Sequence, residues 1–197
     1  MYSSGTGMSH YQPPFESLLE SENDVAFLLD SDFRFCTCSP AWDTFALANG
    51  GRGISRQEII GKKILDFTPD VLRRSYEYKY SQAQQSGSWV EFDYHCSSPE
   101  KIRLIRMSIR PVKDAMLVAN FLRLEEECEP RTPLTTEERR RYFSASEILT
   151  MCAGCRKAKE RDVQDTWTWV PEFLHETNLR VSHGLCPRCF SLFYGDV

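Results

Sequence analysis

Residues 39–50, SPAWDTFALANG, decide how the first half of the chain folds. Pro40 stands where a helix can begin, because its fixed φ suits the first turn and its missing N–H is not needed there. Asn49, Gly50 and Gly51 follow the last apolar residues, and residues of these types end helices. A short helix is therefore expected from Pro40 to about Asn49.

Strand signals stand on both sides of a helical region. Before SPAWDTFALANG, residues 24–38 form two apolar runs around an Asp-Ser-Asp turn, which is typical of a β-hairpin. After it come helical turns over 55–70, a helix over 71–87 and three strand-like runs at 89–98, 101–112 and 115–127. This order predicts an α+β domain, with a five-stranded antiparallel sheet and helices on one face.

The ordered combination resembles a PAS sensory domain over about residues 24–127. SPAWDTFALANG after the first hairpin is similar to the early helix of that family, and IIGKKILDF at 59–67 is similar to a later segment. The resemblance implies a sensor or protein-interaction domain with an unidentified ligand. Six aromatic residues are candidates for lining its cavity, although they equally suit a filled core: Trp42, Phe45, Phe67, Tyr76, Phe92 and Tyr94.

Two cofactor-bearing PAS types fit the sequence poorly. The light-sensing flavin type needs a cysteine on a mid-domain helix, and residues 57–80 contain none. The haem type usually ligates iron through a histidine of the same region, and residues 40–94 contain none. His95, on an expected strand, leaves haem open.

Composition limits the remaining functions. The chain has 197 residues, with 41% hydrophobic and 26% charged residues and a net charge of −4, so a packed core is expected and a general nucleic-acid binder is disfavoured. No apolar run approaches the ~20 residues of a membrane span, and no secretory signal is recognisable, which predicts a cytoplasmic protein. In a reducing compartment its eight cysteines are expected to be thiols or metal ligands.

The last quarter contains two Cys-x-x-Cys pairs, CAGC at 152–155 and CPRC at 186–189. Two such pairs can place four thiolates at the corners of a tetrahedron, which suits zinc. With four protein ligands the site is closed, so its expected role is structural. The predicted ligands are Cys152, Cys155, Cys186 and Cys189, and the expected fold is a small zinc-ribbon or knuckle-like module.

Basic residues beside the pairs are expected to offset the negative charge of a zinc–tetrathiolate. Arg156 and Lys157 follow the first pair, Arg188 lies within the second, and His183 is expected to pack or hydrogen-bond nearby without ligating. Two other chemistries stay open: iron in the same sulfur cage, as in rubredoxin, and a redox-active or metal-free set of thiols. Rubredoxin knuckles favour glycine after the second cysteine, where Arg156 and Phe190 stand here.

The module also resembles a C-terminal appendage of bacterial PAS, GAF and receiver-type signalling proteins, of the form CxxCkk…W…SHGxCPxC. The resemblance covers about residues 150–194 and includes Trp169, Ser182, His183, Gly184 and Pro187 besides the four cysteines. It implies no known activity.

Four segments are therefore expected. Residues 1–23 form a flexible segment and an amphipathic helix, 24–127 the PAS-like domain, 128–149 a linker with a helix, and 150–197 the four-cysteine module. The stretch SASEILTM, residues 144–151, is expected to be helical.

No phosphate loop, nucleophile elbow or metalloprotease motif is present, which predicts a non-catalytic protein. The two resemblances imply that its function is bacterial signalling or regulation. Phe15, Leu18 and Leu19 are at helical spacing. The resemblance to PAS proteins implies a homodimer through the PAS-like domain and this N-terminal helix, together with an unidentified signalling partner. The alternatives are a thiol/zinc redox switch and a rubredoxin-like electron carrier.

Overall fold

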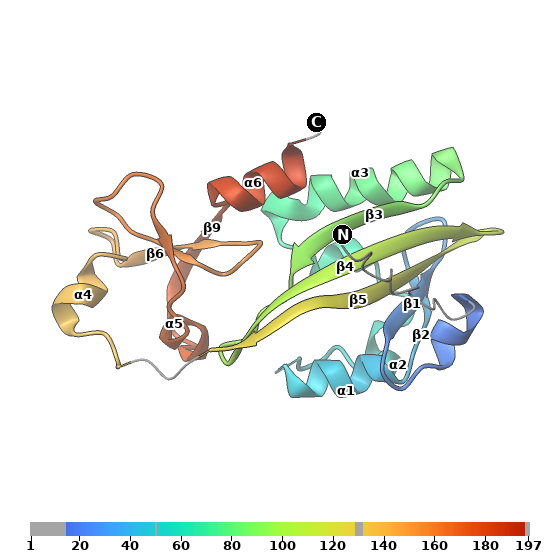
Figure 1. Cartoon of the computed structure of the whole chain (residues 1–197), viewed down its shortest axis with the longest axis horizontal. Coiled ribbons are helices and arrows are strands. Elements are labelled where there is room, and N and C mark those ends of the chain that lie inside the picture. Colours follow the sequence, from blue (N-terminus) through green and yellow to red (C-terminus); the bar gives the residue numbers. More distant parts are fainter. Residues whose placement is uncertain (1–14, 50, 129–131, 196–197) are drawn as a thin grey trace, which may run out of the picture.

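Two β-sheets organise the described part of the chain, which is residues 15–49, 51–128 and 132–195 of a computed structural model (Figure 1). The first sheet has five antiparallel strands in the order β2-β1-β5-β4-β3. Its strands are β1 (Val25–Leu29), β2 (Phe35–Cys38), β3 (Val90–His95), β4 (Lys101–Val112) and β5 (Ala115–Glu127). The expected PAS-like antiparallel sheet is confirmed.

Helical elements fill the interval between β2 and β3. They are α1 (Ala41–Ala48), α2 (Arg56–Ile59), the 3-10 helix η2 (Ile64–Phe67) and α3 (Asp70–Ser86). Gly87 ends α3 in the left-handed conformation, with φ of 64°, and donates its N–H to the carbonyl of Ala83 at 3.1 Å.

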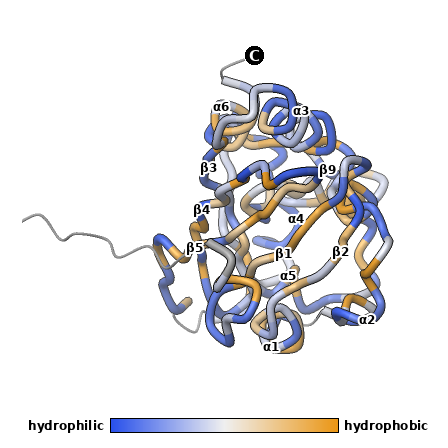
Figure 2. Tube along the Cα trace, turned by 90° about the vertical axis from the view of Figure 1, so that its right-hand side faces the viewer, coloured by the Kyte–Doolittle hydropathy of each residue, from blue (hydrophilic) through white to orange (hydrophobic). Residues whose placement is uncertain are grey.

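These helices cover one face of the sheet, as the sequence predicted. Leu72 and Tyr80 of α3 and Ile59 of α2 share one apolar cluster with Phe27 of β1 and Met107 of β4. The hydropathy of the residues agrees with this packing. In Figure 2, β1 and β2 carry hydrophobic stretches, whereas much of α3 is hydrophilic and faces solvent.

The N-terminal helix packs against the opposite face of the sheet. The amphipathic helix expected here is a six-residue 3-10 helix, η1 (Phe15–Glu20). Leu18 is only 2% exposed and packs with Ala26 of β1 and Ala119 of β5. Leu18 therefore belongs to the core of its own chain.

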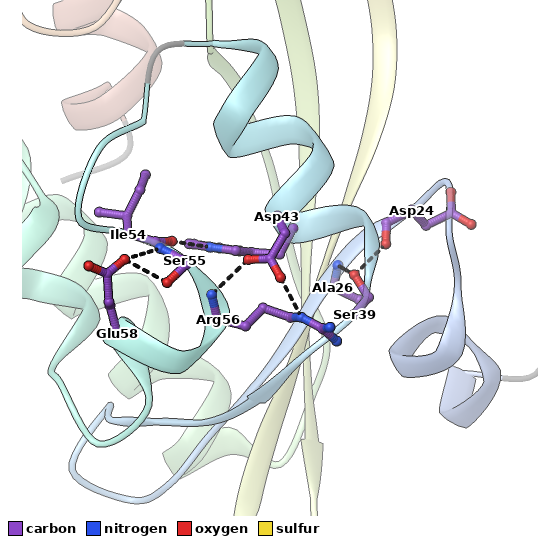
Figure 3. A network of polar contacts seen from close by, with 9 residues as sticks. Asp24, Ala26, Ser39, Asp43, Ile54, Ser55, Arg56 and Glu58 are labelled. Atoms are coloured by element: carbon purple, nitrogen blue, oxygen red, sulfur yellow. Dashed lines mark hydrogen bonds and ion pairs between the residues drawn. The ribbon is translucent and has the colours of Figure 1, made fainter.

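SPAWDTFALANG acts as a polar junction between β1, α1 and α2 (Figure 3). The buried hydroxyl of Ser39 donates to the carbonyl of Asp24 at 2.7 Å and accepts from the N–H of Ala26 at 3.0 Å. Asp43 accepts from Arg56 twice, from the backbone N at 2.7 Å and from Nε at 2.9 Å. The same short stretch thus fixes where α1 leaves the sheet and where α2 begins.

The second sheet belongs to the C-terminal module and has the order β8-β7-β6-β9. Its strands are β6 (Ile148–Cys152), β7 (Ala158–Lys159), β8 (Trp167–Thr168) and β9 (Arg180–Gly184), with β6 and β9 parallel. Three helices accompany it: α4 (Thr136–Arg140), α5 (Glu172–His175) and α6 (Pro187–Tyr194).

The expected helix over 144–151 is wrong, because its second half is strand β6. Leu149 and Met151 are buried while Ile148 and Thr150 are half-buried, which is the two-residue alternation of a strand. Leu149 packs with Tyr142 and Phe173, so residue 142 shares a core with the cysteine module.

None of the helices within the described residues is long and apolar enough to cross a lipid bilayer.

Replacing Ser39 with alanine should destabilise the fold. The variant S39A leaves the buried Ala26 N–H and Asp24 carbonyl without their partner, which costs about 1–3 kcal/mol of unfolding free energy. Urea unfolding measures it. The control S182A removes an exposed hydroxyl from β9 and should change stability by less than about 0.5 kcal/mol. Equal stability of S39A and the parent would contradict this role.

Candidate metal centre

The four predicted cysteines come together at the base of the C-terminal module. Cys152 is the last residue of β6, and Cys155 lies in the tight turn that follows. Cys186 immediately precedes α6, and Cys189 lies in its first turn. One pair thus sits on a β-turn and the other at the start of a helix.

Their geometry suits a tetrahedral metal ion. All four Sγ atoms lie within 4.8 Å of one another, and those of Cys155 and Cys186 are 3.7 Å apart. Metal–sulfur bonds of ~2.3 Å give a tetrahedron with edges of about 3.8 Å. All eight cysteines are free of disulfides. The group can therefore hold a metal ion through four sulfur ligands.

Backbone N–H groups point at the sulfur atoms. The N–H of Cys186 donates to Sγ of Cys152, and that of Cys189 donates to Sγ of Cys186, each at 3.4 Å. The backbone N–H groups of Cys155 and Lys157 also donate, to Cys152 and Cys155 respectively. Such donors stabilise thiolate over thiol.

A non-glycine residue completes the first turn. Arg156 has φ of 62°, in the left-handed region, and its N–H donates to the carbonyl of Cys152 at 2.9 Å. The N–H of Cys152 donates to the carbonyl of Lys157 at 2.8 Å and closes the β6–β7 hairpin. The lack of glycine at this position therefore does not prevent a tight cysteine turn.

Position 154 requires glycine because helix α6 approaches it closely. A Cβ atom at this position would lie 2.8 Å from Sγ of Cys189 and 3.2 Å from the ring of Phe193. Both atoms belong to α6, so the missing side chain lets the turn and the helix meet. Packing against α6 therefore determines that residue 154, the second residue between Cys152 and Cys155, is glycine.

The four thiols cannot all ionise without a cation. Hydrogen bonds from Cys155 and Cys189 lower the pKa of Cys152, and the bond to Cys152 raises the pKa of Cys155 to about 12. The pKa of Cys189 is raised by its hydrogen bonds to the same two residues. A bound divalent cation removes this conflict, because it neutralises two of the four charges.

The expected charged neighbours lie in different places. Lys157 and Arg188 line a cleft of about 530 Å³ together with Cys155, Cys186 and Cys189. Arg156 is exposed on the turn itself. His183 is exposed on β9 and borders another hollow, beside Phe67, and is not one of the four grouped ligands.

His95, which the sequence offered only as a possible haem ligand, lies beside the four cysteines. It ends β3 of the first sheet and lines the same cleft as Cys155 and Arg188. Burial lowers its pKa, and its Nδ1 is buried without a hydrogen-bond partner within the described residues. No pattern in the sequence connected it with the cysteine module.

The six aromatic cavity candidates separate into groups. Trp42 packs edge-on against Phe27 and Phe35, with ring centroids 5.6 and 5.4 Å apart, and Phe67 lies 6.2 Å from Phe35. Trp42 Nε1 also donates to the carbonyl of Ile54 at 2.7 Å.

The second group lies against the cysteine module. Tyr76 contacts Phe92 and Tyr94, with centroids 5.4 and 6.5 Å apart, and also Phe193 of α6 at 5.8 Å. Phe45 belongs to neither group, because its ring lies under Arg103, whose Cζ is 5.7 Å from the centroid.

No family model and no curated protein matches the chain. Solved structures do. One is the PAS domain of the Cronobacter turicensis quorum-sensing receptor RpfR in complex with BDSF, with 15% identity, a TM-score of 0.39 and coverage of 52% of this chain and 95% of that chain.

Two further similar structures are bacterial sensor domains. The photoactive yellow protein domain of the Rhodospirillum centenum histidine kinase Ppr has 12% identity, a TM-score of 0.43 and coverage of 54% and 98%. The PAS domain of Vibrio parahaemolyticus nitrogen regulation protein NR(II) has 13% identity, a TM-score of 0.35 and coverage of 59% and 99%.

Adding a methyl group at Gly154 should weaken metal binding. In G154A the new Cβ overlaps Sγ of Cys189, so the turn and α6 must separate. We expect at least about a tenfold loss of metal affinity in competition with a chromogenic chelator, which corresponds to about 1.4 kcal/mol. The control G184A places its Cβ 3.7 Å from Trp167, an ordinary contact, and should bind like the parent. Unchanged affinity of G154A would refute the packing role.

Proposed function

We propose that this chain is a non-catalytic signalling protein, in which a PAS-type sensor domain is coupled to a structural zinc module. Zinc is preferred over iron because four thiolates in tetrahedral geometry satisfy it fully and because it adds no redox chemistry. Cys152, Cys155, Cys186 and Cys189 would hold the ion, and its contribution is to brace the fold.

Direct docking of α6 on α3 carries this proposal (Figure 1). The buried hydroxyl of Ser75 donates to the carbonyl of Phe193 at 2.7 Å, and the hydroxyl of Tyr194 donates to the carbonyl of Val71 at 2.6 Å. The ring of Phe193 packs on Tyr76, which also contacts the sheet residue Phe92.

This docking joins the metal site to the sensor domain. Cys189 lies in α6, only four residues before Phe193, so the metal ligands and the docking residues share one short helix. The four cysteines and Phe193 also belong to the same apolar cluster as Phe27 and Tyr80 of the sensor domain. A change in the sensor core that shifts α3 would therefore bias the position of α6.

Removing the metal should loosen α3. We expect chelation to increase amide hydrogen exchange in Val71–Tyr80, because α6 loses its anchor, and to leave α1 unchanged, because α1 packs on β1. Hydrogen exchange with mass spectrometry measures both segments.

The double variant S75A/Y194F tests whether the contacts transmit this effect. It keeps all four cysteines and removes both hydrogen bonds, so exchange in α3 should become insensitive to the metal. The control Y78F changes an α3 tyrosine that is 53% exposed and should behave as the parent. Metal-independent exchange of α3 in the parent would rule out the coupling.

A thiol/zinc redox switch is the second candidate, and one observation favours it. Three of the four cysteines border the cleft between the sheet of the sensor domain and the module, although each is less than 8% exposed. An oxidant that enters the cleft would meet Cys155, Cys186 or Cys189 and expel the metal.

Peroxide titration separates the two functions. For a structural site we expect the metal to be retained until peroxide is in large excess, and the exposed Cys36 to be oxidised before the four ligands. Stoichiometric metal release, followed with a chromogenic chelator, would instead establish the switch. An iron carrier would be red.

The proposal includes a reducing, cytoplasmic compartment and an unidentified signalling partner, with a homodimer through the sensor domain. The eight unpaired cysteines support the compartment. Because Leu18 is buried in its own chain, a dimer contact would use other residues of η1 such as the half-buried Leu19. Light scattering at micromolar concentration tests the dimer.

A further inference from the structure

A second cleft in the C-terminal module gathers arginine side chains from separate segments. It has a volume of about 730 Å³ and is lined by Arg139 and Arg140 of α4, by Arg161 after β7 and by Arg180 at the start of β9. Glu147 is its single acidic lining residue within the described part of the chain. Carboxylates offset two of these four arginines, since Arg139 pairs with Glu176 and Arg161 with Asp162, so the positive charge that remains comes from Arg140 and Arg180.

Two of these arginines connect the segments that line the cleft. Arg139 donates two hydrogen bonds to the carboxylate of Glu176, at 2.7 and 2.5 Å, and lies about 5 Å from the ring centroids of Phe143 and Phe173. Arg161 donates its backbone N–H to the carbonyl of Arg141 at 2.7 Å. Their contacts fix α4 and the loop after β7 on the module.

The other two are available to a ligand. The side chain of Arg140 is exposed, and its guanidinium has no ion pair or hydrogen bond within the described residues. The guanidinium of Arg180 is exposed and donates to the carbonyl of Ser146 at 3.2 Å, and in the part of the chain that the structure describes it has no carboxylate partner. A guanidinium presents a planar fork of donors that matches the oxygens of a phosphate or carboxylate.

We propose that this cleft binds a small polyanion that carries at least two phosphate or carboxylate groups. Arg140 and Arg180 come from different segments, so each would bind a separate oxyanion group. The volume lies in the range of small-molecule sites, and Phe143 and Leu179 supply an apolar wall for the body of such a ligand. The site is separate from the four cysteines and does not depend on the proposed signalling function.

Isothermal titration calorimetry of the full chain with inorganic pyrophosphate and, separately, citrate tests the proposal at ~150 mM salt, where weak surface attraction is screened. We expect saturable one-to-one binding of at least one probe. Tighter binding of pyrophosphate assigns phosphate as the natural group, and tighter binding of citrate assigns carboxylate.

The double variant R140Q/R180Q should weaken binding at least about tenfold, because charge-assisted hydrogen bonds are lost from both ends of the ligand. The matched control R52Q/R74Q removes two exposed arginines of the sensor domain and should bind like the parent. Circular dichroism checks that each variant is folded. Absence of saturable binding up to millimolar probe, or equal weakening in R52Q/R74Q, would overturn the proposal, as would unchanged affinity of R140Q/R180Q.

Discussion

Four buried sulfur atoms in mutual contact are the constraint on which the C-terminal half depends. Without a cation their charges conflict, since ionising Cys152 raises the pKa of Cys155. A cation bound to all four would link strand β6 to helix α6, which are far apart in sequence. A module with so small a core needs such a link, because apolar burial alone stabilises a domain of this size poorly.

The same link places the two halves of the protein against each other. Helix α6 carries Cys189 toward the other three cysteines and Phe193 toward Tyr76 of the first domain. Gly154 allows this arrangement by leaving room for both residues of α6. The grouping of the four cysteines, the packing of the module and its contact with the first domain are therefore consequences of one helix in one position.

Much of this architecture follows from local patterns in the sequence. SPAWDTFALANG predicted α1, and the structure adds the reason, since Ser39 and Asp43 bond to both neighbouring elements. The spacing of the two Cys-x-x-Cys pairs was sufficient to predict that the four cysteines come together. Contacts between distant residues could not be predicted: Ser75 and Phe193 are 118 positions apart. Residues 148–152 were misjudged because so short an apolar run fits a helix or a strand until its partner β9 is known.

Metal analysis of purified, unchelated protein combined with X-ray absorption spectroscopy tests the central claim most directly. The account predicts one zinc ion per chain in a shell of four sulfur atoms at ~2.3 Å. Protein without metal, with the cysteines paired as disulfides or with fewer than four sulfur ligands around the ion, would contradict it.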